Sequence, residues 1–161
     1  MDIAALARQL QEQADLHAIA NLKAHYCWLL DTRRTWDAAD LFTEDGVWDG
    51  GEMFGRHEGR DAVGAYFTQI QRDGLPFCLH GVLTPFVELR GEGRAFGRWY
   101  LSMPCTLRDA EGRERAVWGG AWYEDDFVQV DGVWRVQEMR LTNHFWAPLD
   151  RGWVEERFIA A

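Results

Sequence analysis

Hydrophobic positions recur at helical spacing in the first part of the chain. Before Asp31, apolar side chains follow the i, i+3, i+4 spacing of one helix face, at Ile19, Leu22, Tyr26, Leu29 and Leu30. This pattern predicts helix over residues 2–30, in one or two pieces. Two further helices are predicted, a short one over Trp36–Phe42 with Thr35 as its N-cap and another over Ala62–Gln71.

After Gly74 the pattern becomes strand-like. Five runs follow, at Phe77–Leu83, Pro85–Leu89, Arg94–Leu107, Arg115–Val130 and Val133–Phe145. Turns are expected at Gly91–Gly93, Asp109–Gly112 and Asp131–Gly132. The last three runs are long and contain glycines, which favours a strongly curved antiparallel sheet.

The region between the helices has a strand of its own. Thr43–Gly46 is expected to turn, Val47–Asp49 to begin a strand, and Gly50 and Gly51 to bend it. Helices followed by a curved meander are typical of an α+β fold. We expect the helices to pack into the concave side of the sheet and to leave a cavity at its open end.

Composition fits one domain over residues 1–161. The chain is 47% hydrophobic and has nine Trp, nine Phe and four Tyr, which suit either a large core or a pocket for ring-shaped ligands. The formal net charge of −9 argues against nucleic acid and anionic membranes as partners. Three scattered Cys, no visible signal peptide and no membrane-length apolar run lead us to expect a cytoplasmic protein with free thiols.

Two ionisable residues, 49 positions apart, stand where the pattern calls for buried side chains. Asp31 ends the apolar helical segment, where the helix dipole disfavours a carboxylate, and His80 lies in a strand-like run. A carboxylate that orients an imidazole makes a general base near neutral pH. The ordinary alternatives are a buried His80 bonded to a backbone carbonyl, and an Asp31 that pairs with Arg33 or Arg34 or caps a turn.

Tyr26 is a further candidate, as a donor to a developing oxyanion or leaving oxygen, although it also suits the core. It precedes Asp31 by five residues, which is about 140° of rotation on an ideal helix. Both residues can serve one site only if the helix loosens or ends near Asp31.

Arg140 lies in the last strand-like run. If the alternation set by Trp134 and Val136 continues, Arg140 and Glu138 share the inward face. Arg140 then either binds a carboxylate or enolate oxygen of a ligand or pairs with Glu138.

Motifs for metals and nucleotides are absent from the sequence. The five His show no H-E-x-x-H spacing, the Cys form no C-x-x-C pair, and there is no P-loop and no G-x-S-x-G. We therefore expect no metal and no cofactor.

Taken in order, several short motifs resemble the SnoaL-like branch of the NTF2-like superfamily. They are Tyr26-x4-Asp31, Asp40–Trp48, Gly59–Val63, His80 and Gly132–Val136, within roughly residues 10–150. The resemblance implies a cone of curved sheet wrapped around helices, with a deep pocket, and a homodimer or homotrimer.

Within that superfamily, scytalone dehydratase, the bile acid 7-dehydratases and hexachlorocyclohexane dehydrochlorinase use a His–Asp dyad, and Asp31 and His80 match its positions. The resemblance also implies that Tyr26 corresponds to a Tyr of the bile acid enzymes and Trp48 to a pocket Trp of the dehydrochlorinase. Their pocket Arg falls near Met139–Arg140.

These observations together lead us to expect a cofactor-independent lyase that acts on a small, hydrophobic, cyclic substrate. His80 would be the base, Asp31 would hold its tautomer, and Tyr26 would assist the leaving group. The expected substrate-binding residues are Arg140, Trp48, Trp122 and Asn143. The alternatives are an isomerase with the same proton chemistry, a non-catalytic binder of small ligands, and the small subunit of an aromatic-ring dioxygenase.

Overall fold

The computed structural model describes residues 2–159, which form helices packed against one strongly curved sheet. The helices are α1 (Ile3–Asp31), α2 (Thr35–Ala39), α3 (Gly51–Phe54), α4 (Arg60–Asp73) and α5 (Gly152–Glu155). The strands are β1 (Phe42–Asp49), β2 (Arg56–Glu58), β3 (Phe77–Cys78), β4 (Gly81–Gly91), β5 (Arg94–Arg108), β6 (Glu114–Val130) and β7 (Val133–Pro148). No helix among these residues is long and apolar enough to cross a membrane.

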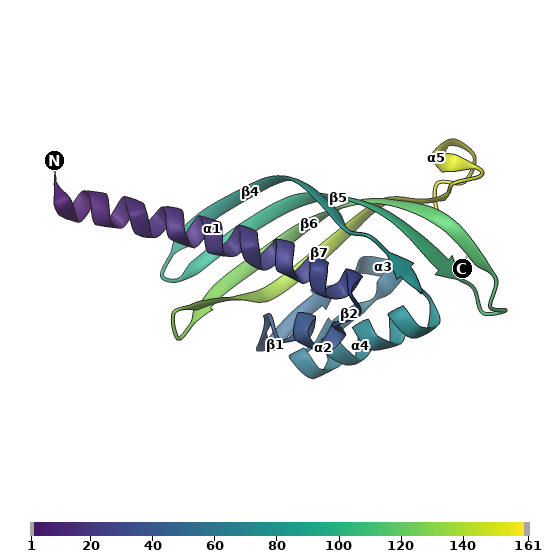
Figure 1. Ribbon diagram of the computed structural model, residues 1–161, viewed down its shortest axis with the longest axis horizontal. Helices are drawn as coiled ribbons and strands as arrows, with labels where there is room; N and C mark the ends of the chain where they lie inside the picture. Colours follow the sequence, from purple (N-terminus) through teal and green to yellow (C-terminus); the bar gives the residue numbers. More distant parts are fainter. Residues whose placement is uncertain (1, 160–161) are drawn as a thin grey trace.

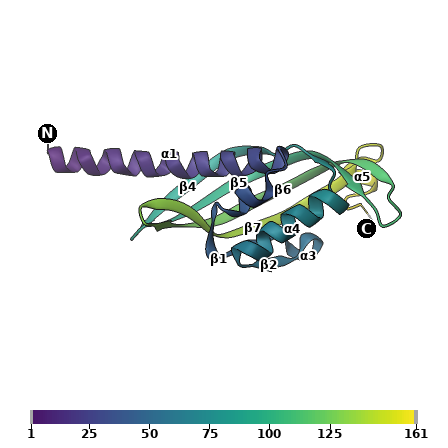
Figure 2. The ribbon, with the colours of Figure 1, turned by 60° about the horizontal axis from the view of Figure 1, so that its bottom comes forward.

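The helices lie on one side of the sheet. Figure 1 shows α1 crossing the concave side of the long strands, with its first turns extending beyond them. Figure 2 shows α4 on the same side as the C-terminal half of α1. The expected α+β cone is therefore confirmed, and the buried end of α1 faces the sheet interior.

The sheet order is β2-β1-β7-β6-β5-β3, and β4 also pairs with β5. All neighbouring pairs are antiparallel except β1 and β7, which run parallel. The expectation of an antiparallel sheet is thus wrong for this one pair. Only strands joined by a tight turn must be antiparallel, and most of the chain lies between β1 and β7.

The long strands β5, β6 and β7 form hairpins where the turns were predicted. In the turn between β6 and β7, Asp131 and Gly132 both have positive φ, at 51° and 78°, which is the type I′ geometry that matches strand twist. Glycine within β6 leaves room for an aromatic ring of the neighbouring strand β7. A Cβ at Gly119 would lie 2.8 Å from the ring of Trp146.

Four predictions for the region around β1 are wrong. The second helix ends at Ala39, and the expected turn at Thr43–Gly46 is an irregular stretch within β1. Thr35 does not cap the helix, because its hydroxyl lies 2.8 Å from that of Thr68 on α4. Gly51 begins the short helix α3 instead of bending a strand.

The boundary that matters for function lies between β3 and β4. Phe77–Leu83 was expected to be one strand, but β3 ends at Cys78 and β4 begins at Gly81. Pro85–Leu89 is part of β4, with a register shift between Leu83 and Phe86. His80 therefore stands in the break between two strands.

Candidate active site

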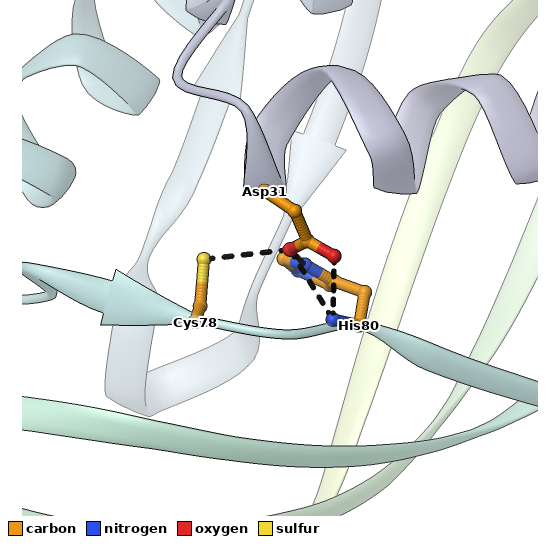
Figure 3. A group of neighbouring side chains, drawn as sticks. All are labelled: Asp31, Cys78 and His80. Carbon is orange, nitrogen blue, oxygen red and sulfur yellow. Dashed lines mark hydrogen bonds and ion pairs between the residues drawn. The ribbon is translucent and has the colours of Figure 1, made fainter.

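Asp31 and His80 meet at the C-terminal end of α1 (Figure 3). Asp31 Oδ1 lies 2.6 Å from His80 Nδ1, and the two Asp31 oxygens accept the His80 backbone N–H at 3.2 and 3.0 Å. The Cys78 thiol donates to the same carboxylate across 3.7 Å. The contact expected between residues 49 positions apart is present, and three donors from one short segment hold the carboxylate.

The break before β4 makes this contact possible. Leu79 N–H still donates to Pro104 O on β5, at 3.1 Å, but the next N–H, that of His80, turns to Asp31. Gly81 then returns to the sheet so closely that a Cβ there would lie 2.9 Å from Ser102 O. The Asp31 carboxylate on α1 thus takes the place of a strand carbonyl as the acceptor for the His80 N–H. The alternation of residues in the sequence does not indicate this change of partner.

The ordinary explanations for Asp31 do not apply. Arg33 directs its guanidinium to the carbonyls of Gln71 and Pro76, and Arg34 pairs with Asp37 at 2.6 Å. Asp31 is thus left to His80. Because a carboxylate only accepts hydrogen bonds, it favours a proton on Nδ1 and leaves Nε2 of a neutral ring as an acceptor.

His80 lines an apolar cavity between α1, α4 and the sheet. The cavity volume is about 50 Å³, counted as the space that the centres of water-sized molecules can occupy. Its apolar lining includes Leu30, Trp48, Phe67, Met103, Leu141 and Trp146. Such a lining suits an apolar ligand, and a base in it works away from bulk water.

Tyr26 lies deep in this cavity beside His80. The two ring centroids are 6.4 Å apart in an edge-to-face arrangement, and the Tyr26 hydroxyl accepts a hydrogen bond from Trp48 Nε1 at 3.1 Å. Burial raises the pKa of Tyr26 well above its ordinary value, so the hydroxyl keeps its proton and can donate it. Helix α1 ends at Asp31, which meets the condition for Tyr26 and Asp31 to serve one site.

Arg140 lies outside the cavity, contrary to the expected alternation. Asp126 pairs with Glu138 and Phe127 with Val136, which leaves Gln137 as an extra residue on β7. This bulge reverses the alternation, so the residues next to Arg140 turn inward instead. Arg140 contacts Asp126 at 2.9 Å and Glu138 at 3.2 Å, and the alternative of an ion pair with Glu138 is the one found.

Trp122 and Asn143 also lie outside the cavity lining. Trp122 is on the opposite face of β6 from Tyr123, and its ring packs on His144 with a centroid distance of 3.8 Å. Asn143 donates to Gly50 O at 3.1 Å and accepts from Trp146 Nε1 at 2.7 Å. Asn143 therefore fixes the ring of a lining residue. Of the four expected substrate-binding residues, the cavity contains Trp48 alone.

A buried ion pair behind the cavity was missed by the sequence analysis. Lys23 Nζ lies 2.8 Å from Asp125 Oδ2, with both side chains fully buried, and 3.3 Å from the ring centroid of Tyr123. Burial lowers the pKa of Lys23 and raises that of Asp125 to about 6. The signal was available, because Lys23 lies at i+4 from Ile19 on the apolar face of α1.

Asp31, Cys78 and His80 also form the one group of metal-ligating side chains that residues 2–159 bring together. Their ligand atoms lie within 4.8 Å of one another, a donor set that suits a divalent metal. Burial and the neighbouring Asp31 raise the pKa of the Cys78 thiol to about 12, so the thiol is protonated. The Cys78 thiol and His80 Nδ1 are both hydrogen-bonded to Asp31. A metal bound here would have to displace the protons of these hydrogen bonds.

The sequence matches a known protein family, and the fold is similar to several solved structures. The sequence matches the SnoaL-like domain family over residues 11–140. A type 2 hexachlorocyclohexane dehydrochlorinase (LinA) is 19% identical with a TM-score of 0.79, and the alignment covers 88% of this chain and 93% of that chain. A putative scytalone dehydratase from Novosphingobium aromaticivorans is 22% identical with a TM-score of 0.70, over 85% of this chain and 89% of that one.

A third similar structure, Rv3472 from Mycobacterium tuberculosis, is a protein of unknown function. It is 27% identical with a TM-score of 0.68, and the alignment covers 83% of this chain and 73% of that chain. These likenesses agree with the curved sheet and enclosed helices described above. Because the sequence match spans well over half of its length, this chain belongs to the SnoaL-like domain family.

Proposed function

We propose that this protein is a cofactor-independent lyase that eliminates a leaving group from a small, hydrophobic, cyclic substrate. The observation that carries the proposal is the 2.6 Å contact between Asp31 and His80 in the wall of an apolar cavity. Membership of the SnoaL-like family supports a lyase or isomerase. The names of two similar structures, a dehydrochlorinase and a putative dehydratase, favour elimination.

In this proposal His80 Nε2 removes a proton from a carbon next to a carbonyl group. Asp31 accepts a hydrogen bond from Nδ1–H and stabilises the imidazolium that forms, as a carboxylate does in other His-based sites. Such a positioned base contributes roughly 10²–10⁴-fold to the rate, so orientation in the cavity and charge stabilisation must supply the remainder.

Tyr26 would donate to the leaving group or to the developing enolate oxygen. Its hydroxyl already accepts from Trp48 Nε1, and a hydroxyl that accepts one hydrogen bond becomes a stronger donor of another. Because burial keeps the phenol protonated, Tyr26 serves as a donor and His80 as the base.

The direct test is NMR in D₂O with 3-hydroxycyclohexanone and 3-chlorocyclohexanone, two ketones that have the same ring and the same acidic C–H positions and differ only in the leaving group. We expect formation of cyclohex-2-enone above the spontaneous rate, with release of water or chloride. Deuterium uptake next to the carbonyl without elimination would favour an isomerase instead. Ligands recovered unchanged and undeuterated would count against an enzyme and for a binding protein or a structural subunit.

A further inference from the structure

Gln71 carries a buried hydrogen-bond acceptor that no donor in the described part of the chain uses. The side chain, on α4, is 6% exposed and lines the same cavity as His80. Its Nε2 donates to Leu30 O at 2.7 Å, whereas Oε1 accepts from no donor within residues 2–159. Buried acceptors without a donor are rare in native proteins, because desolvation is then uncompensated.

The orientation of the amide is fixed by its surroundings. Turning it over would set Oε1 against Leu30 O, and two acceptors repel each other. Leu30 O also accepts the backbone N–H of Arg33 at 3.0 Å, so it does not depend on Gln71. The side-chain amide of Gln71 therefore uses its nitrogen as a donor to Leu30 O and keeps its oxygen, Oε1, as the acceptor without a donor.

No donor within residues 2–159 is hydrogen-bonded to Oε1. In the cavity lining, Leu30 and Leu75 are apolar, and the Cys78 thiol is used by Asp31. Because residues 2–159 supply no donor, we infer that one comes from a water molecule or from a group on a ligand. A hydroxyl group supplies such a donor, whereas a carbon-bound halogen does not.

We propose that Gln71 Oε1 accepts a hydrogen bond from a hydroxyl group of the substrate, so that the cavity selects hydroxylated over halogenated rings. This inference rests on the proposed function, because it takes the cavity as the substrate site. It assigns the natural substrate to the cyclic alcohols and, within the lyase proposal, the reaction to dehydration. Gln71 is then a specificity-determining residue.

The test uses two unreactive probes, cyclohexanol and chlorocyclohexane, titrated into ¹⁵N-labelled wild type and Gln71→Met while the amide shifts of cavity residues are followed. For each protein we take the Kd of chlorocyclohexane divided by the Kd of cyclohexanol. Comparing this ratio between wild type and the variant cancels the difference in hydrophobicity between the two probes. We expect the preference for cyclohexanol to fall by about tenfold in Gln71→Met, the value of one net hydrogen bond.

An unchanged ratio would overturn the inference and leave Oε1 with an ordered water only. Failure of both probes to bind wild type would instead overturn the proposed function, since the cavity would not take small rings. Gln71→Met should keep its melting temperature, because it removes an orphaned acceptor and Leu30 O keeps the Arg33 N–H. Gln71→Glu, assayed below pH 6 where a buried carboxyl is protonated, should retain the preference for cyclohexanol.

Discussion

Replacing His80 with Ala is expected to lower the rate of 3-hydroxycyclohexanone elimination by about 10³-fold, because it removes the only proposed base. The fold should survive the change. Asp31 keeps the backbone N–H of residue 80 and the Cys78 thiol as donors, so its carboxylate is not left unpaired. Product formation by NMR and near-UV circular dichroism of the same samples measure the two effects.

Two variants sharpen this result. His80→Gln retains an amide donor for Asp31 but no base, so it should be as inactive as His80→Ala. His144→Gln changes a histidine that packs on Trp122 outside the cavity and should leave the rate within a factor of about two of wild type. Substantial turnover in His80→Gln would remove His80 from the mechanism.

Asp31→Asn belongs to the same experiment. A carboxamide can donate as well as accept, so it no longer enforces the Nδ1 proton or stabilises the imidazolium. We expect a loss of about 10²–10⁴-fold, comparable to the loss of a base. An active Asp31→Asn enzyme would show that the contact with His80 is structural.

The second large effect concerns folding. Lys23→Met is expected to lower the free energy of unfolding by about 3–5 kcal/mol, because it leaves the fully buried Asp125 carboxylate without its partner. The double variant Lys23→Met/Asp125→Leu should recover most of that loss, since apolar side chains of similar volume replace the pair. Urea unfolding of both variants measures the difference.

The exposed ion pair of Arg34 and Asp37 offers a matched control, because Arg34→Met should barely shift the urea midpoint. A similar shift in Arg34→Met and Lys23→Met would mean that burial of the Lys23–Asp125 pair has no energetic consequence.

The loss in Lys23→Met should also depend on pH. Burial raises the pKa of Asp125 above its unfolded value, so the folded state binds this proton more tightly. The stability from that proton is complete below the ordinary carboxyl pKa and is lost as pH rises through about 6. Removing Lys23 raises this pKa further, so the variant should be less impaired at pH 5 than at pH 8.

The sequence was informative where a local pattern decides the structure. The apolar stripe that ends at Asp31, the hairpin turn at Asp131–Gly132 and the resemblance of the Asp31 and His80 positions to a known dyad all led to features of the structure. Lys23 was readable by the same logic, because it falls within the stripe. Its partner is 102 residues away, and nothing local connects the two.

The sequence misled where one residue changes the register. The extra residue Gln137 reverses the alternation along β7, and this alone moves Arg140 from the cavity to the surface. The strand break at His80 depends on the Asp31 carboxylate from α1, which accepts the His80 N–H. The unpartnered Oε1 of Gln71 depends on the position of Leu30 O, which binds the amide nitrogen. These are tertiary effects, which the hydrophobic pattern of a single sequence does not record.

Nitrogen-15 NMR of the His80 ring, in histidine-labelled wild type and at a pH where the ring is neutral, decides whether His80 is a base held by Asp31. We expect the proton on Nδ1 and a bare Nε2 facing the cavity, with both tautomers populated once Asp31 is replaced by Asn. A wild-type His80 that carries its proton on Nε2 would have no lone pair to offer a substrate and would contradict the proposed mechanism.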